Sequence, residues 1–409
     1  MEPISFANYS CSYQGIDSAA SVPELRQARV ILQNELQELL SASLSPIEWY
    51  QTVNELHDRI ARKAVELCIQ GMVEEGFGQP PVPYAFIVFG SSGREEATLW
   101  SDQDNGMIIS DMPHEGKGAY FAELGQRMTD MLEGLGYAKC EGKVMCSEPL
   151  WRKTLASWKQ QLAAWSSDLN WEPVRNLIIA SDMRFVAGEQ SLAEEWITSF
   201  HEQFRLVPEL SDAVLRNTVK HKATLNVLGR VVTERFGEHA GGFDVKYGLY
   251  IPLVNSARYL ALQHGIKESS TLKRMERLTS LEAVPFTLLD ACQRAFIAAL
   301  KFRRNTPVVI QGDLQHSSGF LNEKQMKQKQ IHYELRDTLG LVRRVHRALQ
   351  RQLRFAEGDA HERAGKGQYR ILEFAASGRG PFRHRFHYGS PYGATHGVYP
   401  LDDERTAQT

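Results

Sequence analysis

The sequence has few cysteines and no long apolar segment. Its five cysteines among 409 residues are scattered and odd in number, a pattern typical of a reducing compartment rather than of a disulfide framework. No uninterrupted apolar stretch approaches the ~18 to 20 residues that span a bilayer, and the first residues lack the basic and apolar pattern of a secretory signal. We therefore predict a cytoplasmic protein with free thiols and no membrane partner.

A strong excess of charge of either sign is also absent. The 47 Lys and Arg residues and 49 Asp and Glu residues give a formal net charge of −2, which argues against a surface built for nucleic acid. Cys140 and Cys146 are the closest pair of cysteines, but no second Cys or His pair follows them, so their spacing does not predict structural zinc. The hydrophobic content of 43% and the length instead predict a globular protein of two or three domains.

The spacing of apolar residues predicts the order of the elements. Two amphipathic helices are expected between residues 23 and 71, followed by a Gly- and Pro-rich stretch that ends helical structure. The apolar runs at 85–89 and 104–111 predict buried strands, and a third strand is expected at 143–145. The remaining patterns predict helices at 94–99, 119–135, 210–235, 247–264, 270–278, 285–304 and 323–355.

These elements divide the chain into four predicted regions. An N-terminal helical region covers 1–80, a small mixed α/β domain covers 81–190, and a helical domain covers 191–356. Residues 357–409 are rich in Gly, Arg, His and aromatic residues without periodicity, so we expect a disordered tail there. The predicted fold class is α+β, with a small mixed sheet flanked by N-terminal helices and a C-terminal helical bundle.

The segment FGSSGREEATLWSDQDNGMII, residues 89–109, carries the most chemical information. A buried strand leads into a tight turn at Gly90, where backbone N–H groups and the hydroxyl of Ser91 or Ser92 can face a phosphate. Arg94 can add a charged contact to phosphate oxygens. This part of the segment is therefore a candidate phosphate-binding turn.

Asp102 and Asp104 form a candidate metal site next to this turn. Residues i and i+2 of a strand point to the same face, so the two carboxylates should lie side by side and repel each other unless a cation binds between them. Oxygen ligands suit Mg²⁺ or Mn²⁺, which can also bridge to nucleotide phosphates. The segment has no Walker lysine, no G-x-G-x-x-G fingerprint and no EF-hand spacing. An Asp- and Gly-rich surface loop is the alternative interpretation.

The pattern Gly90-Ser91 followed by Asp102-x-Asp104 between apolar strands resembles that of the DNA polymerase beta-like nucleotidyltransferases. Its longer form is similar to the PII-protein uridylyltransferases and glutamine synthetase adenylyltransferases, and it resembles most the DUF294 nucleotidyltransferases. The resemblance covers about residues 50–350. It includes the segments GYAKCEGKVMCSEPLWRKTLASW and GFDVKYGLYIPLVNSARYLALQHGI.

This resemblance implies roles for several residues. Asp102 and Asp104 would bind Mg²⁺, and the glycine and serine turn would hold the nucleoside triphosphate while an acceptor hydroxyl attacks its α-phosphate and pyrophosphate leaves. A third carboxylate would bind metal or take the acceptor's proton. Glu141 and Asp182 are the candidates for it, with an ordinary charged or capping role as the alternative for each. Lys246, in GGFDVKYG, would reach the triphosphate.

We therefore predict a nucleotidyltransferase that depends on Mg²⁺ or Mn²⁺ and transfers a nucleoside monophosphate from an NTP to a hydroxyl acceptor. By resemblance, the nucleotide is UTP and the acceptor is a signalling protein such as a PII-like protein. A non-catalytic nucleotide-binding sensor or interaction protein on the same fold is the alternative hypothesis, since no single residue is assigned as the third carboxylate.

Overall fold

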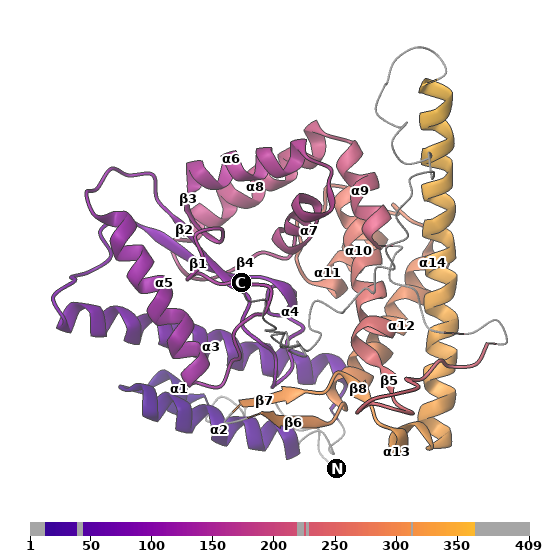
Figure 1. Cartoon of the computed structure of the whole chain (residues 1–409), viewed down its shortest axis with the longest axis horizontal. Coiled ribbons are helices and arrows are strands. Elements are labelled where there is room, and N and C mark those ends of the chain that lie inside the picture. The colour runs from indigo at the N-terminus through magenta and orange to yellow at the C-terminus, as the bar shows by residue number, and fades with distance from the viewer. Residues whose placement is uncertain (1–12, 39–43, 219–224, 226–228, 312–313, 365–409) are drawn as a thin grey trace, which may run out of the picture.

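A four-stranded mixed sheet lies at the centre of the N-terminal half of the computed structural model, which describes residues 13–38, 44–218, 225, 229–311 and 314–364 (Figure 1). The strand order is β3-β2-β1-β4. β1 (Tyr84–Val88) pairs antiparallel with β2 (Asn105–Ile109) and with β4 (Arg184–Gly188), whereas β3 (Arg152–Thr154) pairs parallel with β2. All residues of β1 and β2 are buried. The predicted α+β fold with a small mixed sheet is confirmed.

Helices cover both faces of this sheet (Figure 1). On one side lie α3 (Pro46–Glu74) and α5 (Lys117–Gly134), and on the other lie α6 (Leu155–Ser167) and α8 (Gln190–Leu206). The start of α3 follows from its sequence, because the side chain of Ser45 accepts a hydrogen bond from the Glu48 backbone in a capping box. Three further helices complete this half of the molecule: α1 (Gln14–Asp17) and α2 (Val22–Glu38) beside α3, and α7 (Trp171–Ala180) beside α6.

Two predicted elements of this region are wrong, because in each of them a residue with a left-handed backbone conformation interrupts the expected helix or strand. The predicted helix at 94–99 is instead the short α4 (Gly90–Gly93), and Glu95 ends it with a left-handed φ of 60°. The predicted strand at 143–145 does not form, because Lys143 has a φ of 55° and turns the chain. Val144 still accepts one hydrogen bond, from Asn105 N at 3.0 Å, but the strand that pairs with this edge of β2 is β3.

An aromatic cluster packs α6 and α8 onto the sheet. Trp158 lies at its centre, edge-on to Trp196 at 5.7 Å and beside Trp151 at 6.1 Å between ring centroids. Its indole N–H donates to the Met107 carbonyl of β2 at 2.9 Å, so the buried polar atom has a partner. Trp196 stacks in turn on Phe200 at 5.5 Å. The cluster fixes the helical layer relative to the strand that follows the aspartate pair.

The C-terminal half is mainly helical, as predicted. A π-helix, η3 (Lys246–Tyr250), leads directly into α10 (Ile251–Gln263), and α12 (Phe286–Arg304) packs against both. The long α14 (Lys329–Ala364) lies along α12 and α10 (Figure 1). The other helices here are α9 (Glu209–Thr218), α11 (Thr271–Ser280) and α13 (Glu323–Met326).

This half also contains strands that the sequence analysis did not predict. β5 (Phe243–Asp244) pairs with β8 (Phe320–Leu321), and β6 (Val308–Gln311) pairs with β7 (Leu314–Ser317). The run of β-branched residues in β6 favours an extended strand, although its flanks had been taken as helical. These two small sheets form one side of the cavity described below.

Two further boundaries differ from the predictions. Of the helix expected at 210–235, α9 contains the residues up to Thr218, and residues 219–224 and 226–228 lie outside the described residues. Residues 229–235 form no helix, because Gly229 is left-handed and a β-branched run follows it. Residues 357–364, expected to begin a disordered tail, instead belong to α14. The remaining residues of that predicted tail, 365–409, lie outside the described residues.

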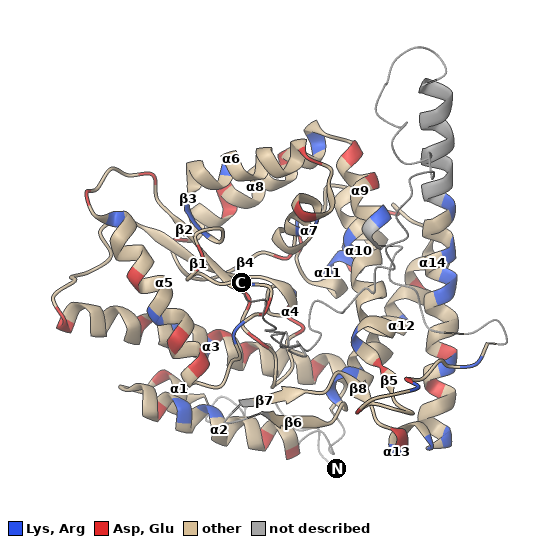
Figure 2. Cartoon of the chain, in the orientation of Figure 1, with Lys and Arg blue, Asp and Glu red and all other residues tan. Residues whose placement is uncertain are grey.

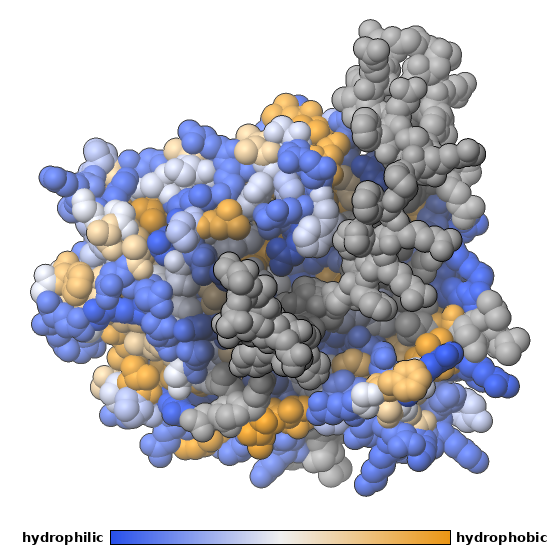
Figure 3. All heavy atoms as spheres, in the orientation of Figure 1, coloured by the Kyte–Doolittle hydropathy of each residue, from blue (hydrophilic) through white to orange (hydrophobic). Residues whose placement is uncertain are grey.

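The surface is ordinary for a folded domain. Figure 3 shows a mainly hydrophilic face with small, separate apolar patches, and Figure 2 shows basic residues gathered along α14. Of these, Arg344, Arg347 and Arg351 are exposed to solvent. Within the described ranges, no helix reaches both the length and the hydropathy of a membrane-spanning segment.

A buried network of charged side chains joins the two halves. Asp182, only 1% exposed, accepts hydrogen bonds from three arginines: Arg94 at 2.5 Å, Arg258 at 2.5 Å and Arg274 at 3.1 Å. Arg258 belongs to α10 and Arg274 to α11, whereas Arg94 follows α4. Burial alone would raise the pKa of Asp182, but these three arginines outweigh it and lower the pKa to about 2.

The same network reaches the π-helix. Arg94 also donates to the Glu96 carboxylate at 2.8 Å and to the Tyr250 hydroxyl at 2.8 Å, and that hydroxyl donates to Glu96. Since Tyr250 is the last residue of η3, the network sets the position of the π-helix relative to the sheet. Every charged group named here has a partner, as burial requires.

Replacing Asp182 should unfold the protein more easily. Asp182→Asn leaves three buried arginines without their shared carboxylate, so we expect the free energy of unfolding to fall by about 3–5 kcal/mol at pH 7. Because the folded pKa is about 2, the wild-type contribution is present above the unfolded value of 3.8 and is lost only as the pH falls towards 2. Urea unfolding followed by circular dichroism measures the difference. The exposed Glu115→Gln is the matched control, and equal stability of the two variants would contradict the prediction.

Candidate active site

Asp102 and Asp104 lie just before β2, with their side chains on the same side of the chain. The residue between them shows why: Gln103 points into the core, where its amide donates to the carbonyls of Thr129 (3.1 Å) and Tyr137 (3.2 Å). Both aspartates therefore project away from the core, and each is partly exposed. The prediction that the i and i+2 positions bring the carboxylates together agrees with the structure, in which their oxygens lie within 4.8 Å.

Gly90 makes room for one of these carboxylates. It has a left-handed φ of 54°, and a Cβ atom built on it would lie 2.3 Å from Asp104 Oδ2. Only glycine therefore allows the turn and the carboxylate to approach so closely. Next to it, Ser91 and Ser92 are partly exposed in α4. The predicted turn and the predicted metal ligands thus form one unit.

A cysteine completes this group of donors. Cys140 Sγ lies within 4.8 Å of a carboxylate oxygen of both aspartates. The side chain is 4% exposed. Sequence reasoning missed this residue, because the cysteine spacing tested only for zinc sites made of several cysteines and histidines. Two carboxylates and a thiol are a donor set that fits a divalent cation.

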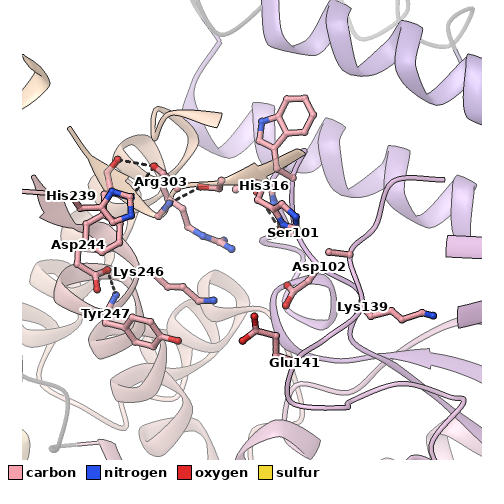
Figure 4. A pocket seen from close by; sticks show the side chains of 17 residues that line it. Ser101, Asp102, Lys139, Glu141, His239, Asp244, Lys246, Tyr247, Arg303 and His316 are labelled. Carbon is pink, nitrogen blue, oxygen red and sulfur yellow. Dashed lines mark hydrogen bonds between the residues drawn. The ribbon is translucent and has the colours of Figure 1, made fainter. Parts of the chain in front are cut away.

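A cavity of about 530 Å³ opens in front of Asp102 and separates the two halves of the molecule (Figure 4). On the sheet side it is lined by Thr98, Trp100, Ser101, Asp102, Ala138, Lys139 and Glu141. On the opposite side it is lined by His239, Asp244, Lys246, Tyr247, Arg303, His316, Ser317, Ser318, Gly319 and Phe320. Asp102 and Glu141 thus face the basic residues Lys246 and Arg303 across the cavity, and each side also contributes a residue of the opposite charge, Lys139 on the first and Asp244 on the second.

Lys246 and Arg303 supply positive charge opposite the aspartates. Figure 4 shows the Lys246 side chain extending towards Asp102, and its charge acts to lower the pKa of Asp104. Lys246 is the first residue of η3, whose start is fixed by Asp244: its carboxylate accepts a hydrogen bond from Tyr247 N at 2.8 Å. Arg303 lies over the ring of Tyr250 at 4.4 Å. Sequence reasoning found Lys246 but not Arg303, which has no local motif.

The other predicted residues are divided between the cavity and the buried network. Glu141 is exposed and lines the cavity near Asp102, but it is not part of the close group of donors (Figure 4). The predicted phosphate contact Arg94 and the candidate carboxylate Asp182 do not line the cavity. Both are buried and bonded to each other, so these two predictions are corrected: the residues join the two halves of the molecule.

An aromatic surface is a further feature that the sequence did not reveal. His239 stacks on Phe320 with ring centroids 4.0 Å apart and planes at 16°, and both line the cavity. Tyr247 and Trp100 line it as well. These rings come from four separate segments of the chain, so no spacing in the sequence could have grouped them. They offer flat apolar surface of the kind on which a nucleobase stacks.

Two family models match the sequence. Residues 31–172 match the model described as "Putative nucleotidyltransferase DUF294", and residues 208–353 match the model described as "Putative nucleotidyltransferase substrate binding domain". No curated protein matches the sequence significantly. The first match contains Asp102, Asp104 and Cys140, and the second contains Lys246 and Arg303. The cavity therefore lies between the two matched segments.

The aspartate pair should reduce the stability of the metal-free protein. Burial, followed by the charge of Asp102, raises the pKa of Asp104 from 3.8 to about 7. The folded state therefore loses stability as the pH rises from about 4 to 7, and Asp104→Asn should remove this penalty. We expect the variant to melt about 2–4 °C above the wild type at pH 8 in chelator, with the difference vanishing near pH 4.

Differential scanning calorimetry at several pH values measures this difference. Glu115→Gln again serves as the control, because that side chain is exposed. A lower melting temperature for Asp104→Asn than for the control at pH 8 would contradict the prediction.

Proposed function

Because this chain belongs to the DUF294 family of nucleotidyltransferases, we propose that it transfers a nucleoside monophosphate from an NTP to a hydroxyl acceptor with the help of a divalent cation. The observation that carries the proposal is the cavity between the two halves. It has carboxylates on one side and Lys246 and Arg303 on the other, which are the two kinds of group that a triphosphate bound to a cation requires.

The residues of the cavity suggest separate roles in the proposed reaction. Asp102 and Asp104 would hold Mg²⁺ or Mn²⁺, which when bound supplies positive charge to the phosphates. Lys246 and Arg303 would contact the β- and γ-phosphates, which leave as pyrophosphate when the acceptor hydroxyl attacks the α-phosphate. Ser91 and Ser92, in the turn beneath Asp104, remain candidates for further phosphate contacts. In this arrangement the protein positions charge and forms no covalent intermediate.

The acceptor's proton needs a base at the edge of the cavity. Glu141 is exposed there and lies near Asp102, so we propose it for this role (Figure 4). The stacked rings of His239 and Phe320 would hold the base of the nucleotide. The resemblance to uridylyltransferases makes UTP the first nucleotide to test and a PII-like signalling protein the first acceptor.

The aspartates should be essential for turnover. We expect pyrophosphate release from one of the four labelled NTPs with Mg²⁺ or Mn²⁺ and a cell extract as the source of acceptor. Replacing both carboxylates by amides, in Asp102→Asn/Asp104→Asn, should reduce the rate at least about 10³-fold, because the cation loses its ligands. Glu115→Gln should keep the wild-type rate.

Transfer that persists in the double variant would overturn this mechanism. Binding of an NTP without pyrophosphate release under every condition would instead support the alternative hypothesis of a nucleotide sensor. Equilibrium dialysis with the same labelled nucleotides separates the two outcomes.

Lys246 should act on the phosphates. Lys246→Ala removes a positive charge opposite the aspartates, so we expect the rate of transfer to fall about 10²- to 10³-fold. Lys273→Ala is the matched control, because Lys273 pairs with Glu95 on the surface and does not line the cavity. Pyrophosphate release under saturating NTP measures both, and equal rates for the two variants would exclude Lys246 from the reaction.

A further inference from the structure

Cys140 occupies a position beside the aspartate pair where a third carboxylate was expected. Its sulfur and one oxygen from each of Asp102 and Asp104 all lie within 4.8 Å of one another. Neither of the carboxylates considered for that position joins this group: Glu141 lies farther out in the cavity, and Asp182 is held by three arginines. The third donor beside the pair is therefore a sulfur atom.

The backbone holds the cysteine rigidly in this place. Gln103, between the two aspartates, forms a parallel bridge with Lys139, and its N–H donates to the Ala138 carbonyl at 2.9 Å. The Cys140 carbonyl accepts from Lys143 N at 2.9 Å, which closes the following turn. The segment that carries the thiol is thus hydrogen-bonded to the segment that carries the carboxylates, so the three donors do not depend on a flexible loop.

Cys140 also differs from the other buried cysteines of the described chain. Cys146 Sγ lies 3.4 Å from the Gly125 carbonyl, and Cys68 Sγ lies 3.7 Å from the sulfur of Met131. Cys292 is enclosed in α12 at 2% exposure. None of these three belongs to a group of potential metal ligands among the described residues. They serve as packing residues, whereas Cys140 has its thiol against a carboxylate.

We propose that Cys140 is a third ligand of the cation in this site, and that its sulfur shifts the preference of the site from Mg²⁺ towards Co²⁺ and Zn²⁺. Mg²⁺ binds oxygen ligands almost exclusively, whereas thiolate favours the softer first-row cations. On binding, the Cys140 thiol gives its proton to solvent and its sulfur lone pair forms the bond to the cation. No oxidation or reduction is involved. The inference rests on the proposed function, since it concerns the same site.

Cobalt reports the sulfur ligand directly. Co²⁺ bound to a thiolate has a strong charge-transfer band in the near ultraviolet that oxygen ligands do not produce. Titration of the chelator-treated full-length protein with CoCl₂ should produce this band in the wild type and in Cys292→Ala. It should be absent in Cys140→Ser and Cys140→Ala. The alanine variant is included because it removes the sulfur without burying a new hydroxyl, and circular dichroism checks the fold of each.

Calorimetry then measures the preference of the site for one divalent cation over another. Serine offers an oxygen in place of sulfur, so in Cys140→Ser the ratio of the Zn²⁺ affinity to the Mg²⁺ affinity should fall about tenfold or more, the scale on which groups around a metal site change its affinity. The same titration is performed on Asp104→Asn, and cation binding that is lost in this variant is assigned to the site.

The outcomes separate the inference from the function on which it rests. Binding of Co²⁺ that depends on Asp104 but gives no charge-transfer band in the wild type would overturn the role of Cys140 and leave the aspartate site intact. A band that persists in both Cys140 variants would also overturn it, because another thiol would be the ligand. If no cation binds in a way that depends on Asp104, both the inference and the proposed metal site are wrong.

Discussion

The carboxylate of Asp182 is the point on which the arrangement of the two halves depends. It accepts hydrogen bonds from Arg94 of the sheet half and from Arg258 and Arg274 of the helical half, and all four side chains are buried. A buried charge is tolerated only with its partners in place, so a shift of one half against the other that keeps these side chains buried would leave arginines without their carboxylate. The network therefore favours one arrangement of the two halves on either side of the cavity.

Asp104 is a second carboxylate whose pKa is shifted by its surroundings, but in the opposite direction to that of Asp182. At Asp182, positive charge outnumbers negative and lowers the pKa of the carboxyl group, whereas at Asp104 burial and a second carboxylate raise it. The first arrangement stabilises the fold. The second is a cost to the fold that a bound cation would offset, and Gly90 leaves the space that the Asp104 carboxylate occupies. Ligand-binding sites commonly reduce the stability of the free protein, because a group whose charge is already compensated within the fold gains little by binding a ligand.

Local patterns in the sequence are sufficient to predict those parts of the fold and the site whose residues are close together in the chain. The strands β1 and β2, the turn at Gly90 and the shared orientation of Asp102 and Asp104 follow from apolar runs and the period of a strand. The predictions of Arg94 as a phosphate contact and of Asp182 as a candidate third carboxylate fail because nothing in the neighbouring sequence of either reveals that they meet in the interior. Cys140 reaches the aspartates through a parallel bridge between distant segments, and Arg303 does so by the packing of α12. Such contacts depend on tertiary structure, which periodicity does not report.

The residues around the cavity extend in sequence from Thr98 to Phe320. A chain that emerges from the ribosome therefore exposes the aspartates well before Lys246, Arg303 and the stacked rings have been synthesised. Until then, the carboxylate pair has only solvent in front of it, and Arg94 and Asp182 lack the arginines of α10 and α11. Only translation through both matched segments brings together all the residues that line the cavity.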